Sequence, residues 1–241
     1  MAFMVWAVEE PSAVAQIDGA IAALSSPAAF AAHWPDAAGQ PPMVLAVGDG
    51  NHSLATAKAY WEELKPTLSA EQLETHPARF CLAEVCNVHS PAICIEAIHR
   101  VLFGVEAAQL KADFAVWLEA RGASLAPEGT QQLCLSGQGR DYPLEISGSP
   151  EPLAVGTVEH FIEDYLAEHP GTTVDYIHGA AAACAMAGPE SHNTAFLLPD
   201  LSKSDIFKGV VMGGVLPRKA FSMGHAEEKR YYIECRSLLE A

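Results

Sequence analysis

The chain has 241 residues, of which half are apolar and 18% are charged, which is typical of a folded globular protein and excludes extensive disorder. Thirty acidic residues against 14 basic ones give a formal net charge of −16 at pH 7. Such a surface repels nucleic-acid phosphates and anionic membranes, so we expect no nucleic-acid or membrane partner, and any anionic ligand must be held by local groups.

The six cysteines have irregular spacings, lie mostly in apolar segments and include no Cys-x-x-Cys pair. This pattern predicts reduced core residues and a cytoplasmic location. The N-terminus lacks the basic region of a signal peptide, and no apolar run reaches the length of a membrane span.

In the first hundred residues, apolar residues recur at the spacing of one helix face at 11–24 and 53–65. This pattern predicts two helices, and Pro66 ends the second one. A Gly/Pro-rich loop separates them. Short apolar runs in the same part of the chain predict strands, at 3–8, 43–47, 79–88 and 93–103.

The remainder mixes helices and strands, which indicates an α/β or α+β fold with a mixed sheet flanked by helices. The chain is expected to be one domain over 1–241, with its weakest point at 147–152. The expected elements are a helix at 105–121, a hairpin of 132–135 with 142–146, a helix at 158–169, strands at 173–177 and 195–198 around a small-residue helix, a helix at 202–212, and a helix or strand at 226–239.

One segment has more groups suited to metal or phosphate chemistry than any other. It is Val-Gly-Asp-Gly-Asn-His-Ser at 47–53. It follows an apolar run and precedes a helix, so it is expected to be a strand–turn–helix. Gly48 and Gly50 permit a sharp turn, and the new helix offers free N–H groups to an anion. Asp49 and His52 would then act on a metal or phosphate. The turn matches neither a Walker A loop nor a GxGxxG fingerprint.

The alternative interpretation of this segment is an ordinary Asp/Gly turn in which Asn51 or Ser53 caps the helix. The sequence physics alone leaves both interpretations open.

A second candidate is the His99-Arg100 pair, which lies inside an apolar stretch after Glu96. Arg100 would neutralise a bound phosphate and His99 would donate a hydrogen bond to it. The alternative is a core histidine and an arginine paired with Glu96, because buried polar groups need partners in either case.

Arg218 and Lys219 are a third candidate, since adjacent cations are rare in this acidic chain. They would close over an anionic ligand or form a solvated turn. The segment from Asp175 to His178 is interpreted as a structural strand end. His52, His89 and His99 would have to converge to bind zinc, but their spacing does not require it.

Five ordered segments together resemble the domain-of-unknown-function 1015 family: 48–58, 96–101, 176–179, 216–224 and 228–236. That family is similar to the archaeal free serine kinases and, more distantly, to the ParB and sulfiredoxin superfamily, whose strand–turn–helix grips nucleotide phosphates. The resemblance therefore implies a ParB/sulfiredoxin-like core. Family members usually have a further N-terminal region, so the chain is expected to be short at this end relative to the family and its sheet to be incomplete there.

In the kinase-like members the turn reads Asp-Gly-His-His-Arg. Asp49, Gly50 and His52 match this pattern, whereas Asn51 and Ser53 differ from it. Arg100 or Arg218 is expected to take the place of the absent arginine. The resemblance implies a nucleotide or another phosphorylated small molecule as ligand, with magnesium and ATP or ADP as cofactors.

The leading hypothesis is phosphoryl transfer to a small hydroxyl substrate such as serine, with Asp49 and His52 as catalytic residues and Asp49 as the magnesium ligand. Phosphate binding is assigned to Gly48, Gly50, Asn51, Ser53, His99, Arg100, Arg218 and Lys219. The alternatives are a non-catalytic ligand-sensing or scaffold module and a metal-dependent hydrolase that uses Asp49, His52 and His99. No transition metal is expected under the first two hypotheses. The substrate and the oligomeric state stay open.

Overall fold

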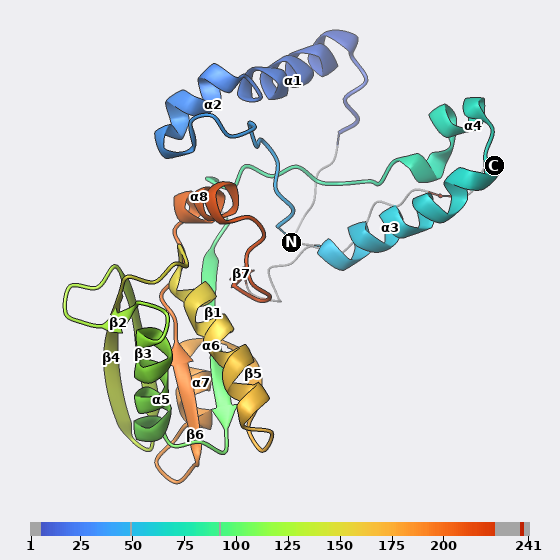
Figure 1. Ribbon diagram of the computed structural model, residues 1–241. Coiled ribbons are helices and arrows are strands. Elements are labelled where there is room, and N and C mark those ends of the chain that lie inside the picture. The colour runs from blue at the N-terminus through green and yellow to red at the C-terminus, as the bar shows by residue number, and fades with distance from the viewer. Residues whose placement is uncertain (1–5, 49, 92, 225–236, 239–241) are drawn as a thin grey trace. The chain divides into compact units, whose positions relative to one another are not determined.

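The computed structural model describes residues 6–48, 50–91, 93–224 and 237–238, and the chain divides into two units (Figure 1). One unit comprises residues 1–46 and 204–216, and the other comprises 47–203 and 217–241. The expected weak point at 147–152 lies inside the second unit, between strand β4 and helix α6.

The first unit is helical. It contains α1 (Pro11–Leu24), α2 (Pro27–His33), the 3-10 turn η1 (Pro35–Ala37) and most of α8 (Lys203–Gly213). Trp34 stacks on Phe207 of α8, with ring centroids 6.4 Å apart, and Phe30 is buried. The predicted helix at 11–24 is confirmed to the residue, and Pro11 at its first position explains the start.

The apolar side of α1 is exposed along its whole length. Val14, Ile17, Ile21 and Leu24 have between 37% and 61% of their surface accessible. Among the described residues no single helix is long and apolar enough to cross a membrane, although the bent pair α1 and α2 passes that test jointly.

The second unit begins with short helical elements. These are α3 (Asn51–Leu64), η2 (Lys65–Thr67), α4 (Ala70–Thr75) and η3 (Pro77–Arg79). The predicted helix at 53–65 is therefore confirmed, and it begins two residues earlier than expected. Ser69 and Gln72 form a capping box that fixes the start of α4.

Two predicted strands in this part of the chain are wrong. Residues 43–47 and 79–88 contain no strand, and Leu45, Val47, Leu82 and Val85 are more than half exposed. An apolar run forms a strand only where a neighbouring strand pairs with it, and neither run has one here. Of the predicted strand at 3–8, residues 6–8 are not in a strand and 1–5 lie outside the described residues, as does most of 226–239.

The described strands of the second unit form a seven-stranded sheet in the order β2-β4-β3-β6-β1-β5, with β7 paired to β1. The strands are β1 (Ile95–Phe103), β2 (Ser124–Leu125), β3 (Gln131–Gly137), β4 (Arg140–Ser147), β5 (Thr173–His178), β6 (Asn193–Leu197) and β7 (Phe221–Met223). The predicted hairpin and the strands at 93–103, 173–177 and 195–198 are confirmed.

The α+β class with flanking helices is also confirmed, but the described pairings are all antiparallel where a mixed sheet was expected. Strands β5 and β6 run in the same direction and lie on opposite sides of β1. The crossover through α7 therefore produces no parallel pair. The ParB/sulfiredoxin-like core stays a prediction.

Helices cover both faces of the sheet (Figure 1). On one face α5 (Ala107–Glu119) and α6 (Ala154–Glu168) pack through Phe114, Phe161 and Phe196, whose ring centroids lie 4.8 to 5.9 Å apart. On the opposite face α7 (Ala180–Met186) packs its alanines against Val101 and Ala195. Because side chains alternate along β1, Arg100 and Leu102 share the α6 face and His99 and Val101 share the α7 face.

Candidate functional site

The glycine turn that the sequence singles out leads directly into helix α3. Gly50 is the N-cap residue and has a left-handed backbone with φ of +72°, a conformation that glycine adopts without steric cost. No side chain caps this helix start, so the Asn51 or Ser53 cap of the alternative interpretation is wrong. Asp49 lies outside the described residues.

His52 and Ser53 lie in the first turn of α3 and are exposed, as is Asn51. With Thr56, Ala57, Tyr60 and Leu238, they line an open hollow of about 670 Å³. No contact among the described residues joins His52 to His99 or Arg100. The convergence of these three side chains therefore stays a prediction.

Gly48 is the part of the turn that the structure ties to the sheet. A Cβ atom built on Gly48 would lie 2.7 Å from the sulfur of Met223, the last residue of β7. Met223 is paired with Ile95 at the start of β1. The backbone before the turn thus passes close to the sheet end from which Glu96 and Arg100 project, and only a glycine fits there without displacing Met223.

Arg100 is fully buried and forms an ion pair with Glu159 of α6. Its Nε and Nη2 both donate to Glu159 Oε2 at 3.1 Å, and Nη1 donates to the carbonyl oxygen of Ile98. Nη2 also donates to the carbonyl oxygen of Arg218 at 3.2 Å. Burial lowers the pKa of the guanidinium, and Glu159 opposes this effect. The expected Glu96 partner is wrong, because Arg100 pairs with Glu159 and Glu96 contacts His178 instead.

Tyr176 completes this buried group from strand β5. Its hydroxyl donates to the second oxygen of Glu159, and its ring lies 5.1 Å from the Arg100 guanidinium carbon. Burial, with the hydrogen bond to Glu159, raises the pKa of Tyr176 to about 12, so its hydroxyl remains a donor at neutral pH. The sequence analysis interpreted the Tyr176 segment as structural and did not identify Glu159. The sequence feature that could have pointed to Glu159 is a carboxylate between apolar positions of a helix.

His99 projects from the other face of β1 and is only 6% exposed. Its Nδ1 accepts a hydrogen bond from the backbone N–H of Leu198 at 3.2 Å, which requires Nδ1 to be unprotonated. Burial lowers the pKa of His99 below its ordinary value of 6.5; Arg100 and His178 act in the same direction and Asp200 opposes them. His99 is therefore a neutral core histidine whose proton lies on Nε2.

Two further acidic groups lie at the same end of the sheet. Glu96 is in contact with His178 Nε2 at 2.6 Å, and Asp200 accepts a hydrogen bond from the backbone N–H of Ala97 at 2.8 Å. These contacts join β1, β5 and the segment after β6. Among the described residues, no three His, Cys, Asp or Glu side chains are arranged to hold a metal ion.

Arg218 and Lys219 are exposed and precede β7, from which Ala220 separates them. Lys219 has a left-handed backbone with φ of +49°, which is uncommon for a residue with a Cβ atom. Its Nζ lies 4.9 Å from the centre of the Tyr176 ring. The structure thus brings Arg218 and Lys219 together with Arg100, and these two cations, not Arg100, are accessible to solvent.

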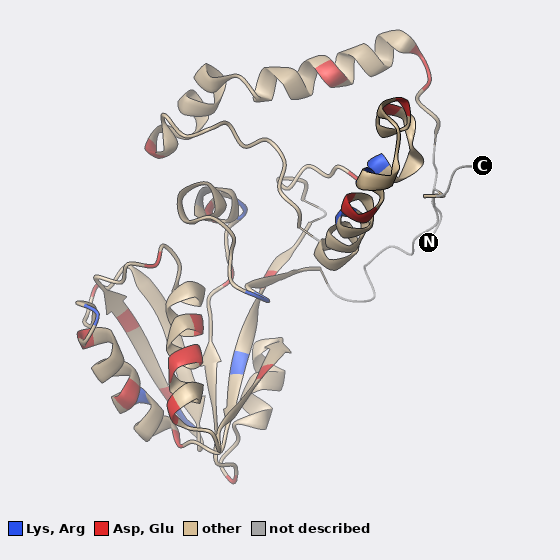
Figure 2. Ribbon diagram, turned by 45° about the vertical axis from the view of Figure 1, so that its right-hand side comes forward, with Lys and Arg blue, Asp and Glu red and all other residues tan. Residues whose placement is uncertain are grey.

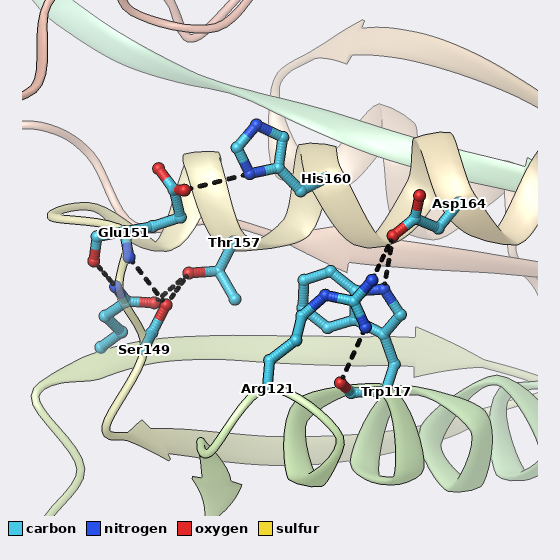
Figure 3. A network of polar contacts seen from close by, with 8 residues as sticks. Trp117, Arg121, Ser149, Glu151, Thr157, His160 and Asp164 are labelled. Carbon is cyan, nitrogen blue, oxygen red and sulfur yellow. Dashed lines mark hydrogen bonds and ion pairs between the residues drawn. The ribbon is translucent and has the colours of Figure 1, made fainter.

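A separate cavity of about 230 Å³ lies between α5, α6 and the loop after β4. Its polar side chains interact with one another: Asp164 accepts hydrogen bonds from Arg121 and the Trp117 indole, and Glu151 contacts His160 (Figure 3). The guanidinium of Arg121 also lies 4.1 Å from the Trp117 ring. These contacts tie α5 to α6 on the surface.

Comparison with known proteins gives one family and one solved structure. No curated protein matches the sequence. A solved structure of a free serine kinase point mutant in complex with AMP is similar, with a TM-score of 0.43 and 12% identity, over 71% of this chain and 80% of that chain. A family model described as a protein of unknown function, DUF1015, matches residues 4–170. The chain therefore belongs to the DUF1015 family.

Proposed function

We propose that this protein binds a small molecule that carries a phosphate group, such as a nucleotide, at the end of the sheet where β1 and β7 meet. The observation that carries the proposal is the loop before β7. It presents two exposed cations, Arg218 and Lys219, and its backbone is attached to the buried Arg100. A phosphate suits this arrangement because arginine and lysine donate charge-assisted hydrogen bonds to its oxygens.

The negative charge of the rest of the molecule strengthens the case that this pair of cations binds an anion. Acidic positions recur along the helices that flank the sheet (Figure 2), and the chain has a net charge of −16. An anion approaching this protein is repelled over most of the surface. Two adjacent cations fixed at one place would offset that repulsion locally.

The glycine turn supplies the second half of the proposed site. Gly48 lies beside Met223, at the other end of the short strand β7 from Lys219. Three residues separate Lys219 from Met223, so the two residues are at most about 13 Å apart along the chain. A nucleotide can extend over such a separation, so the N–H groups at the start of α3 and the loop cations would contact opposite ends of one ligand.

Phosphoryl transfer to a small hydroxyl substrate such as serine is the reaction that we propose for this site. Asp49 would hold magnesium or orient the hydroxyl group, and His52 would stabilise the developing charge. Positioning and charge neutralisation supply most of the catalysis in such reactions.

Calorimetric titration with ADP, AMP and inorganic phosphate, each with and without magnesium, tests the binding proposal. We expect at least one of them to bind, and the Arg218→Ala/Lys219→Ala double variant to weaken binding by about tenfold to a hundredfold, the size expected for loss of charge-assisted contacts. The control is Arg140→Ala, which removes an exposed cation in the β3–β4 hairpin. Absence of binding by the wild-type protein would contradict the proposal.

Transfer is tested separately by incubating the protein with ATP or ADP, magnesium and free serine and measuring phosphoserine. We expect product from the wild-type protein and none from Asp49→Asn. If the nucleotide binds but no phosphoserine forms, the protein is a ligand-sensing module with respect to this substrate, and the transfer proposal fails.

A further inference from the structure

We propose that Arg100, Glu159 and Tyr176 are positioning residues that hold the loop at 217–219 in place, so that Arg218 and Lys219 face the ligand. This inference rests on the proposed function for its purpose. Its geometry and its first test are independent of any ligand.

The contacts run from the helix through the sheet to the loop. Glu159 on α6 binds the Arg100 guanidinium through two nitrogens, and Arg100 in turn donates to the backbone carbonyl of Arg218. A backbone contact fixes the path of the loop whatever side chain it carries. The Arg218 side chain is thus left exposed to solvent.

Tyr176 provides the second attachment. Its ring is close to two cations, at 5.1 Å from the Arg100 guanidinium carbon and 4.9 Å from Lys219 Nζ, and its hydroxyl donates to Glu159. The ring therefore attracts both positive charges. With the left-handed backbone of Lys219, these contacts define one conformation of the loop.

Stability alone does not account for a buried ion pair at this position. Arg100 and Glu159 have 0% and 8% of their side-chain surface exposed, and the desolvation of such a pair commonly equals or exceeds its attraction. Well-packed apolar residues of similar size would serve a core equally well. Apolar residues could not form the hydrogen bonds to the Ile98 and Tyr176 groups, and they could not donate to the Arg218 carbonyl, which is the bond that reaches the loop.

The test follows from this difference. The double variant Arg100→Met/Glu159→Leu replaces both charges with apolar side chains of similar shape. We expect it to fold with a melting temperature close to that of the wild-type protein, because the relieved desolvation offsets the lost hydrogen bonds. Limited digestion with trypsin then measures how readily the loop opens at the Arg218–Lys219 bond. We expect cleavage at this bond to be at least about tenfold faster in the variant, and cleavage after Arg140 to be unchanged.

Tyr176→Phe is the milder second variant, which removes only the hydroxyl group and leaves the ring beside both cations. We expect a smaller increase in cleavage at Arg218, of about threefold. The matched control is Asp164→Asn, a carboxylate-to-amide change in the same helix α6 whose partners are Arg121 and Trp117 (Figure 3). It should leave cleavage at Arg218 unchanged.

Calorimetry with ADP on the same proteins links the loop to the ligand, and we expect affinity to fall about tenfold in the double variant and not in Asp164→Asn. Unchanged cleavage at Arg218 in both folded variants would overturn the inference. Faster cleavage in a protein whose wild-type form binds no phosphate compound would support the positioning role and reject the proposed function alone.

Discussion

Helices α1 and α6 have nearly the same length and a similar helical spacing of apolar residues, yet they differ in what covers those residues. In α6 the apolar positions Val158, Phe161 and Ile162 are at most 1% exposed, because the sheet and α5 pack on them. In α1 no residue is buried, and Ile17 is 51% exposed. The comparison shows that the spacing of apolar residues predicts a helix but does not predict which element packs against it.

The largest expected effect is a loss of stability when the packing at Phe161 in α6 is removed. Phe161→Ala should lower the free energy of unfolding by about 3 to 5 kcal/mol, because it leaves a cavity among Phe114, Trp117 and Phe196. Urea denaturation followed by far-UV circular dichroism measures this loss. A cost below about 1 kcal/mol would show that the core of the second unit is less well packed than its geometry indicates.

The second expected difference is pH dependence, which we assign to His99 in the buried part of the sheet. The pKa of His99 is lowered in the folded protein, so the unfolded chain binds a proton first as the pH falls below 6.5. The contribution of His99 is therefore complete above that pH and is lost below it, with a slope of at most about 1.4 kcal/mol per pH unit.

His99→Asn tests this assignment, because the asparagine oxygen can still accept the hydrogen bond from Leu198 without titrating. The variant should show a flatter decline of unfolding free energy between pH 6.5 and 5 than the wild-type protein. His192→Asn is the control, since that histidine is 84% exposed and pairs with Glu106 at the surface. Equal slopes for the wild-type and His99→Asn proteins would reject the assignment.

The smallest expected effect is at α1. Ile17→Ser should change the unfolding free energy by no more than about 0.5 kcal/mol, because its side chain is exposed and packs against little. Chemical denaturation, compared with the conservative variant Ile17→Val, measures the change. A loss above 1.5 kcal/mol would mean that the apolar side of α1 is covered in solution, and the contrast with α6 would then disappear.

Much of the site was predictable one segment at a time. The positions of His99 and Arg100 in a buried strand, of the loop cations before β7 and of the glycine turn before a helix all follow from local pattern. The partner of Arg100 could not be predicted from local pattern. Glu96 is near Arg100 in sequence, whereas Glu159 is brought near by the packing of α6 on the sheet. The strands predicted at 43–47 and 79–88 failed for a related reason, since pairing depends on a neighbour that an apolar run does not specify.

The sequence by itself determined most of the helices, strands β1 and β3 to β6, the α+β class and the family, because hydrophobic period, turn residues and ordered motifs are local properties of the chain. The short elements α2, α4, β2 and β7 were not predicted. Only the tertiary structure decided which charges are exposed. Arg100 and Arg218 are both arginines beside apolar residues, but strand pairing and the packing of α6 bury the first, whereas the loop before β7 leaves the second in solvent. Burial depends on contacts between distant segments, which no local pattern contains.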